Sequence, residues 1–202
     1  MALVLIAGQA GSGKKFVADY LAQKHGYNYI TTVTDRKETE KDKINPKTKS
    51  VSRHLFESMA QKGIFMEKSQ HRGHNFGVTR TKLLASLEEH ANNVIVMTPQ
   101  GVEKMRKYLT ANDLPHVAVY IDNDVFDNVH TLTSEYESNS LSRDDFIERV
   151  TALGKEERHW SEQAKKSNVF DIIMEMDDGD YEQTALILNE HVERLNLFKA
   201  RK

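Results

Sequence analysis

The sequence predicts an α/β fold in which a parallel sheet is covered by helices on both faces. Two observations carry this prediction. Short apolar runs alternate with amphipathic helical patterns along the chain, and a glycine-rich turn directly follows the first apolar run. With 202 residues the chain can bury a substantial core, so one domain with small subdomains is expected rather than two independent domains.

The predicted strands and helices alternate in order. Apolar runs predict strands over residues 3–7, 27–33, 94–97, 117–121 and 171–174. Helical spacing predicts helices over residues 14–25, 80–91, 100–110, 143–166 and 181–199, and Gly26 is expected to end the first of them. The last helix repeats its apolar positions at intervals of four and three, namely Tyr181, Ala185, Leu188, Val192 and Leu195. Right-handed crossovers then place the glycine-rich turn at the carboxyl edge of the sheet.

The glycine-rich turn reads G-x-x-x-x-G-K between a strand and a helix, the context in which this motif (the P-loop) cradles phosphate. Its backbone N–H groups can converge on phosphate oxygens, and the helix N-terminus adds a favourable dipole. Lys14 is expected to reach the β and γ phosphates of ATP. Lys15 stands where the motif normally has the Ser or Thr that holds Mg²⁺. The predicted ATP-binding residues are Gly8, Gln9, Ala10, Gly11, Ser12, Gly13, Lys14 and Lys15.

Two segments interrupt the alternation. Residues 35–50 are dense in Lys, Asp and Glu and contain Pro46, whereas residues 131–142 are rich in Ser, Thr, Asn and Glu without a clear period. Such insertions suit a small acceptor-binding subdomain and a mobile lid, and two solvated surface loops explain the composition equally well. The predicted organisation is one domain with a core of residues 1–33, 80–130 and 143–202, an insertion over about 34–79 and a lid over about 131–142.

Composition excludes several classes of function. A net charge of −2 argues against non-specific nucleic-acid binding as the main role. The chain has no cysteine, which excludes a disulfide framework, a thiol nucleophile and a Cys-based zinc site. No apolar stretch approaches the length of a membrane span. We therefore expect a cytoplasmic monomer or homodimer whose partners are small-molecule nucleotides, without nucleic-acid or membrane partners.

Several ordered segments resemble the guanylate kinase family of nucleoside monophosphate kinases, over about residues 3–198. Residues 33–37 are similar to the family's S-x-T-T-R-x-P-R, residues 56–67 to F-x6-G-E-F-L-E, and residues 73–77 to G-N-Y-Y-G. Further matches to Q-G-A/V, I-x-x-R-L and Y-D-x5-D-D lie at residues 100–102, 146–150 and 170–178. The resemblance implies a P-loop NTPase-type parallel sheet flanked by helices, with a small nucleoside-monophosphate-binding insertion and a lid.

The resemblance implies catalytic roles for Lys14, Arg36 and Arg149. Arg36 falls where the family clamps the acceptor phosphate, a task that suits a planar guanidinium. Arg149 falls where an arginine stabilises charge on the transferring phosphoryl group. The alternatives are a surface arginine in a charged loop for Arg36 and a helix-face arginine paired with Asp145 for Arg149.

The resemblance also implies how the acceptor is bound. Glu67 falls on the carboxylate that reads the N1–H and 2-amino donors of guanine, because a carboxylate offers acceptors only. Its alternative is a solvated glutamate beside Lys68. The other implied acceptor-binding residues are Thr32, Arg36, His74 and Phe76, where Thr32 helps to hold the base and His74 could donate to the acceptor phosphate. Thr32 could equally be a strand-end threonine without a ligand. The alternative for His74, a loop histidine without a ligand, is favoured by how readily histidine occurs in loops.

The chain departs from the family pattern at several positions, and these departures leave the function open. Lys15 replaces the P-loop hydroxyl, Thr39 replaces a second clamping arginine, and Glu38 replaces the proline between the two arginines. Thr48 stands where the family has a phosphate-binding tyrosine, and Phe76 lacks a phenol hydroxyl. Val96 and Thr98 replace an acidic pair, and Ser and Asn at residues 138–140 replace the lid arginines. The metal ligands are therefore unknown. Asp35, Asp122 and Asp124 lie near predicted strand ends and could supply a replacement carboxylate, or could serve only in surface loops.

The predicted function is phosphoryl transfer from ATP, with Mg²⁺, to a nucleoside monophosphate, most simply GMP or dGMP. Two alternatives stay open at this point. One is a catalytically impaired module that binds a nucleotide or a protein partner, and the other is a kinase with a changed acceptor. The retained glycines and Lys14 favour an enzyme, because a pure scaffold has no use for a lysine among phosphates.

Overall fold

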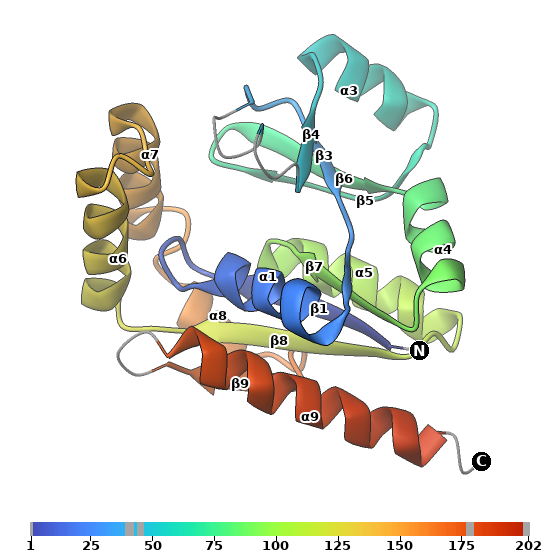
Figure 1. The fold of residues 1–202 in the computed structure, drawn as a ribbon. Helices are drawn as coiled ribbons and strands as arrows, with labels where there is room; N and C mark the ends of the chain where they lie inside the picture. The colour runs from blue at the N-terminus through green and yellow to red at the C-terminus, as the bar shows by residue number, and fades with distance from the viewer. Residues whose placement is uncertain (1, 39–42, 44–46, 177–179, 200–202) are drawn as a thin grey trace.

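Two sheets organise the chain in the computed structural model, which describes residues 2–38, 43, 47–176 and 180–199 (Figure 1). The larger sheet has five strands in the order β2-β7-β1-β8-β9, and every neighbouring pair is parallel. Their bounds are Ala2–Gly8 for β1, Asn28–Tyr29 for β2, Asn92–Val96 for β7, His116–Asp122 for β8 and Ile172–Glu175 for β9. The predicted α/β fold with a parallel sheet is thus confirmed.

Helices cover both faces of the larger sheet because alternate residues of β1 point to opposite sides. Val4 and Ile6 face a layer formed by α1 (Lys14–His25) and α9 (Tyr181–Lys199). Leu3 and Leu5 face a layer formed by α4 (Arg80–Glu89), α5 (Pro99–Ala111) and α8 (Trp160–Lys166). β1 is buried throughout, which explains why its sequence is an uninterrupted apolar run.

The predicted insertion forms a sheet of its own, in the order β4-β3-β6-β5. Its elements are β3 (Thr32–Thr34), β4 (Thr48–Ser50), α3 (Arg53–Gln61), β5 (Phe65–His71) and β6 (His74–Thr79). A small core lies between this sheet and α3, where the rings of Phe56 and Phe65 stack with centroids 4.5 Å apart beside Val33. This core keeps the insertion ordered although it lies outside the main sheet (Figure 1).

The last part of the fold is a helical pair beside the P-loop. α6 (Val125–Glu137) and α7 (Arg143–Gly154) bury Leu132, Leu141 and Leu153 against Ala10 of the loop. Ser142 caps α7 by accepting a hydrogen bond from the Asp145 N–H, as the predicted helix start at residue 143 requires. Throughout the described ranges, no helix combines the length and the apolarity that a membrane crossing needs.

Three predicted elements are wrong in their extent. Residues 27–33 are not one strand: β2 pairs with β7 of the larger sheet, and after Ile30 the chain crosses to β3 of the smaller sheet. Residues 131–142 are not a loop throughout, because α6 continues to Glu137 with Leu132 on its buried side. Residues 143–166 are not one helix, since α7 ends at Gly154 and α8 begins at Trp160. In each case a tertiary contact overrides the local pattern.

Candidate active site

The P-loop leaves β1 at Gly8 and enters α1 at Lys14, at the carboxyl edge of the larger sheet. Two of its glycines have left-handed backbone angles, with φ of 81° at Gly11 and 73° at Gly13. Both also lie too close to neighbours for a side chain: a Cβ would be 2.3 Å from the Asn128 carbonyl oxygen at Gly11 and 2.0 Å from the Tyr181 ring at Gly13. The loop is therefore held by packing as well as by its own conformation.

The Lys14 ammonium folds back over the loop and donates a hydrogen bond to the Gln9 carbonyl oxygen at 2.7 Å. Burial is the main reason why the pKa of Lys14 is lowered to about 7. Glu157 opposes this shift, and the neighbouring cations Lys15, Arg72 and Arg149 add to it. A phosphate group entering the loop would supply the negative charge that keeps Lys14 protonated.

Glu157 is a buried partner of the P-loop that sequence reasoning missed. Its side chain is 0% exposed, its Oε2 accepts the Ala10 N–H, and its Oε1 lies 2.8 Å from His71 Nε2. Its backbone carbonyl accepts a hydrogen bond from the Gln9 side chain at 2.8 Å. Burial alone would raise the pKa of Glu157, but the His71 hydrogen bond, the Lys14 charge and the Ala10 N–H together lower it.

The position of Glu157 explains the break between α7 and α8. Its N–H donates to the Ala152 carbonyl at 2.8 Å, which turns the chain out of the helix shortly after Gly154. In sequence the residue is one of two consecutive glutamates in an amphipathic stretch, a pattern typical of a solvated helix. Gly154 was the only local signal that the helix ends there.

Glu67 of β5, a predicted acceptor-binding residue, is buried with a side-chain oxygen that lacks a hydrogen-bond partner. The residue is 4% exposed, and its Oε1 is without a hydrogen bond. A Cβ at Gly101, in the first turn of α5, would be 3.3 Å from this oxygen, so the carboxylate lies against the helix N-terminus. Burial raises the pKa of Glu67 to about 7, opposed by Lys104 and Ser69. The alternative of a solvated glutamate is therefore wrong.

The other predicted acceptor-binding residues lie in the smaller sheet or directly after β3. Thr32 is half-buried on β3, with its hydroxyl 3.4 Å from that of Thr48. Arg36 follows β3, where its N–H donates to the Thr34 hydroxyl at 3.1 Å. His74 begins β6, with Nδ1 3.8 Å from an Asp35 oxygen, and Phe76 lies half-buried on the same strand. The structure thus brings Thr32, His74 and Phe76 onto two neighbouring strands, β3 and β6, with Arg36 just beyond the end of β3.

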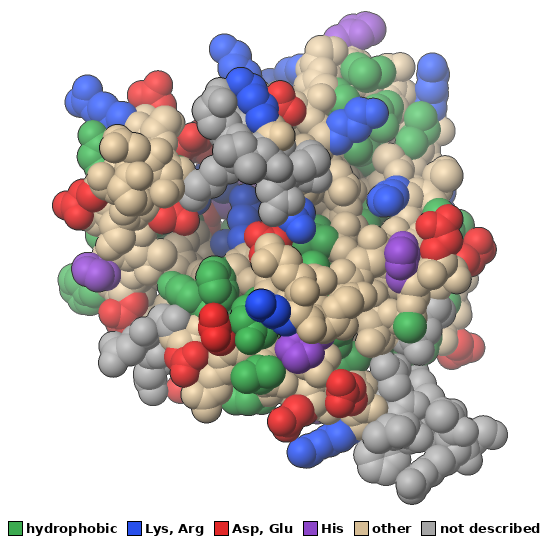
Figure 2. Space-filling view, viewed as in Figure 1, with side chains coloured by type: hydrophobic (Ala, Val, Ile, Leu, Met, Phe, Trp, Pro, Cys, Tyr) green, Lys and Arg blue, Asp and Glu red, His purple; other side chains and the backbone are tan. Residues whose placement is uncertain are grey.

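Arg149 lies on α7 and faces α6, where NH1 is 3.4 Å from Glu135 Oε2. The predicted alternative pairing with Asp145 is wrong, because Asp145 accepts a hydrogen bond from the Ser142 hydroxyl. Arg149 also acts on the pKa values of Lys14 and Arg72, and Arg36 acts on that of Arg72. Arg72 and Arg149 thus lie close enough to act on the P-loop lysine Lys14, and Figure 2 shows Lys and Arg side chains inside a hollow of the molecule.

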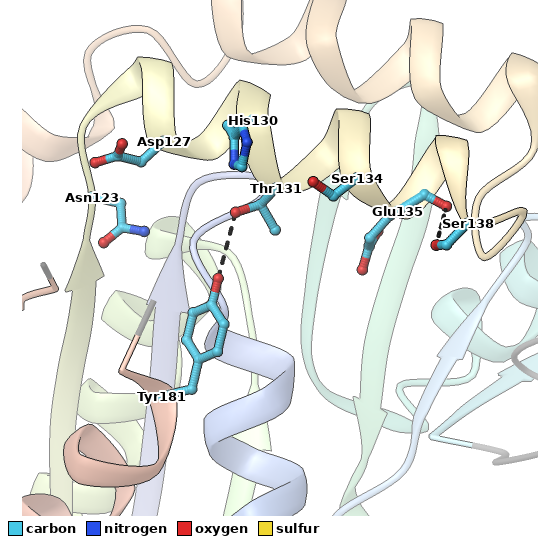
Figure 3. A pocket seen from close by; sticks show the side chains of 8 residues that line it. All are labelled: Asn123, Asp127, His130, Thr131, Ser134, Glu135, Ser138 and Tyr181. Atoms are coloured by element: carbon cyan, nitrogen blue, oxygen red, sulfur yellow. Dashed lines mark hydrogen bonds between the residues drawn. The ribbon is translucent and has the colours of Figure 1, made fainter. Parts of the chain in front are cut away.

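A pocket of about 660 Å³ continues from the P-loop along α6 (Figure 3). Tyr181, from the start of α9, points its hydroxyl toward Thr131 of α6 at 3.4 Å and packs its ring on Gly13. The pocket therefore adjoins the loop through one aromatic ring. Its lining residues all have polar side chains, although apolar atoms form most of the exposed lining: they are Asn123, Asp127, His130, Thr131, Ser134, Glu135, Ser138 and Tyr181.

The three candidate metal-binding aspartates have other partners in the fold. Asp35 accepts hydrogen bonds from the Asn75 N–H at 2.7 Å and its side-chain amide at 2.6 Å. Asp124 caps α6, and Asp122 is buried, with Oδ2 accepting from Lys165 at 2.8 Å. No group of three or more His, Asp or Glu side chains suitable for a metal occurs among the residues that the structure describes. These residues do not fit a Mg²⁺ site built by the protein alone.

A few predicted positions lie outside the described residues. They are Thr39 and Pro46 in the charged segment after β3 and the acidic pair at residues 177 and 178. Besides Glu157, sequence reasoning missed Arg72, which lies at the tip of the β5–β6 hairpin, and the role of His71. The three residues act through partners far away in sequence, so no local motif marks them.

Comparisons with known proteins identify the family and the fold of the chain. Residues 1–195 match the sequence model of a family described as guanylate kinase. A guanylate kinase of Malacoplasma penetrans (strain HF-2) is 24% identical over 121 residues, 59% of this chain and 61% of that protein. The matched segment thus spans about three fifths of that relative. The crystal structure of guanylate kinase from Anaplasma phagocytophilum superposes with a TM-score of 0.61 at 15% identity, over 96% of this chain and 85% of that one, which shows a shared fold.

Proposed function

Because the chain belongs to the guanylate kinase family, we propose that it transfers the γ-phosphoryl group of ATP to a nucleoside monophosphate, most simply GMP or dGMP. The observation that carries the acceptor is Glu67. A buried carboxylate with a bare oxygen is costly unless a ligand supplies donors to it, and guanine presents two. Adenine would face this oxygen with its acceptor N1 and is disfavoured.

On the donor side, the P-loop N–H groups and Lys14 bind the ATP phosphates, and the pocket beside Tyr181 takes the nucleoside end. The contact of this pocket with the loop, where the Tyr181 ring packs on Gly13, supports this assignment. The described residues supply no metal site of their own, so Mg²⁺ would be held by the ATP phosphates and would supply charge neutralisation there. The protein acts in the cytoplasm as a monomer or homodimer.

On the acceptor side, Thr32 helps to hold the base, Arg36 and His74 hold the acceptor phosphate, and the Phe76 ring lines the acceptor site. An oxygen of that phosphate attacks the γ-phosphorus, and the bond from the γ-phosphorus to the β,γ-bridging oxygen breaks to release ADP. Arg149 stabilises the charge on the transferring group from α7. No nucleophilic side chain is required, because positioning and electrostatics supply the catalysis.

A non-catalytic module is the second candidate, and one specific observation favours it. The described residues offer no protein-built metal site, and Lys15 stands where the P-loop hydroxyl would be. Such a protein would bind ATP or GMP, or a protein partner, without turnover. A kinase with another acceptor lies between the two, since the phosphate clamp departs from the family pattern at Thr48 and Phe76 while Glu67 is kept.

The deciding experiment measures ADP release from ATP and Mg²⁺ with GMP, dGMP, AMP, CMP, UMP and dTMP in turn. We expect release that depends on GMP or dGMP, and loss of at least about a hundredfold in kcat/KM for Lys14→Ala. Lys24→Ala is the matched control, because Lys24 is exposed at the other end of the same helix. ADP with another monophosphate would identify a changed acceptor. No ADP with any acceptor, together with measurable ATP or GMP binding, would establish the non-catalytic module.

A further inference from the structure

The β5–β6 hairpin has an arginine where its turn geometry disfavours one. His71 pairs with His74, so Arg72 and Gly73 form a two-residue loop, and their φ angles are 52° and 73°. Positive φ at both positions is the signature of a type I′ turn, for which Asn-Gly is preferred. A long side chain at the first position is strained there. Strained backbone positions of this kind cluster at functional sites, so the strain at Arg72 indicates a role for its side chain beyond forming the turn.

The Arg72 side chain packs against α7 and the His71 ring instead of extending into solvent. Its side chain is 21% exposed, NH1 lies 3.4 Å from Glu148 Oε1 on α7, and Nε lies 3.5 Å from the His71 ring. The Arg72 N–H donates to Glu156 Oε2 at 2.9 Å. The hairpin tip is thus held against the segment between α7 and α8 from both its backbone and its side chain.

The hairpin tip is also tied to the P-loop itself. His71 hydrogen bonds one oxygen of Glu157, and the other oxygen of Glu157 accepts the Ala10 N–H. The His71 ring packs against Trp160 at a centroid distance of 5.1 Å. Two hydrogen bonds therefore fix the distance between Arg72 and the loop that holds the ATP phosphates.

Arg72 has a carboxylate partner in Glu148, 3.4 Å from NH1, but other cations also act on it. Burial is the main reason why its pKa is lowered, and Arg149 and Arg36 lower it further, while Glu148 and Glu157 act against them. Glu157 is committed to His71 and Ala10, as described above. Two arginines from different elements, Arg72 and Arg149, also both act on Lys14. Cations gathered in this way are stabilised when a polyanion enters between them.

We propose that Arg72 is a phosphate-binding residue of this site, contacting the phosphoryl group in transfer between the P-loop and the acceptor. This inference rests on the proposed function and names a residue for it that lies outside every motif of the sequence. Arg72 supplies a guanidinium from the hairpin tip. The lid arginines of the family are missing in this chain, because residues 138–140 are Ser and Asn. A planar, bidentate donor suits the equatorial oxygens of that group.

Arg72→Asn tests the proposal because it separates the turn from the guanidinium. Asn-Gly is the preferred type I′ pair, so this variant should have an unfolding temperature equal to or above that of the wild type. It should nonetheless lose at least about thirtyfold in kcat/KM with ATP and GMP, with the larger part in kcat. Arg72→Lys should recover only part of the lost kcat/KM. Guanidinium ions added to the Arg72→Gly protein should raise its kcat. Arg53→Gln, at an exposed arginine of α3, is the control.

The result that overturns the proposal is a folded Arg72→Asn protein whose kcat/KM and ATP affinity both stay within about threefold of the wild type. Failure of the proposed function would be seen separately, as a wild-type protein that releases no ADP with any acceptor. In that case calorimetric titration with ATP and with inorganic tripolyphosphate decides. A Kd that is tenfold weaker in Arg72→Asn, but not in Arg53→Gln, supports the phosphate contact without turnover. An unchanged Kd in Arg72→Asn overturns the proposal.

Discussion

At the residue scale, Glu67 makes the stability of the fold depend on pH. Its pKa is about 7 in the folded chain against 4.5 for a solvated carboxyl. The folded state therefore holds a proton that the unfolded state releases between these values, so stability falls as the pH rises from about 4.5 to about 7. The effect amounts to about 3 kcal/mol.

We expect Glu67→Gln to remove this loss. We measure the free energy of unfolding of both proteins by urea denaturation. The difference, variant minus wild type, should increase by about 3 kcal/mol between pH 4.5 and pH 7.5. Glu57→Gln is the matched control, because Glu57 is an exposed glutamate of α3. If the free energies of unfolding of wild type and Glu67→Gln changed with pH in parallel, the pKa of Glu67 would not be raised by folding, and this prediction would be wrong.

The same titration predicts how GMP binding depends on pH. Guanine needs the ionised carboxylate, so the Kd for GMP should weaken about tenfold per pH unit below about 7 in the wild type. The acceptor phosphate titrates identically with both proteins, so the difference between wild type and Glu67→Gln isolates this residue.

Glu67→Gln should also relax the preference for GMP over AMP. An unchanged preference would remove Glu67 from the base site.

At the element scale, one side-chain pair joins β3 to β6 next to Arg36. The Asp35 carboxylate accepts both the backbone and the side-chain N–H groups of Asn75, and the Thr34 hydroxyl donates to the Asn75 carbonyl at 2.7 Å. Asp35→Asn places two amide donors opposite each other and should cost about 1.5–3 kcal/mol. Asn75→Asp places two carboxylates there and should cost at least as much.

The double variant, Asp35→Asn with Asn75→Asp, exchanges the donor and the acceptor and should recover most of both losses. Urea denaturation of the four proteins measures the coupling directly. Losses that simply add in the double variant would mean that the two side chains do not bond to each other. ADP release by the same proteins would report whether the junction also orients Arg36.

Elements were predictable where local pattern and tertiary contact agree. β1 and α1 follow from an apolar run, glycines and a helical period, and Gly26 ends α1 with a φ of 68°. The division of residues 27–33 between two sheets was not predictable, because strands of either sheet have the same apolar alternation. The candidate site divides in the same way. A motif marks Lys14, whereas Glu157 and Arg72 become visible only when distant segments are brought together.

At the scale of the whole molecule, α9 closes the face of the larger sheet that carries α1. Leu188 is fully buried in this layer, while its neighbour Ile187 is 52% exposed. Leu188→Ala should cost about 2–5 kcal/mol and lower the unfolding temperature, because it leaves a cavity under the sheet. Ile187→Ala removes the same kind of side chain from the solvent side and should stay within about 0.5 kcal/mol. Equal losses in thermal denaturation would mean that α9 does not dock by this face.

The Tyr181 ring on Gly13 has a consequence for mutational scans of the loop. A methyl group at this position would overlap the ring, so even Gly13→Ala must displace the start of α9 before any nucleotide is present. Gly13 is thus protected twice, once by the phosphate chemistry of the loop and once by a neighbour from the far end of the chain. Intolerance at Gly13 is then no measure of nucleotide use, and a lineage that had given up catalysis would still keep this glycine as long as it kept the tyrosine.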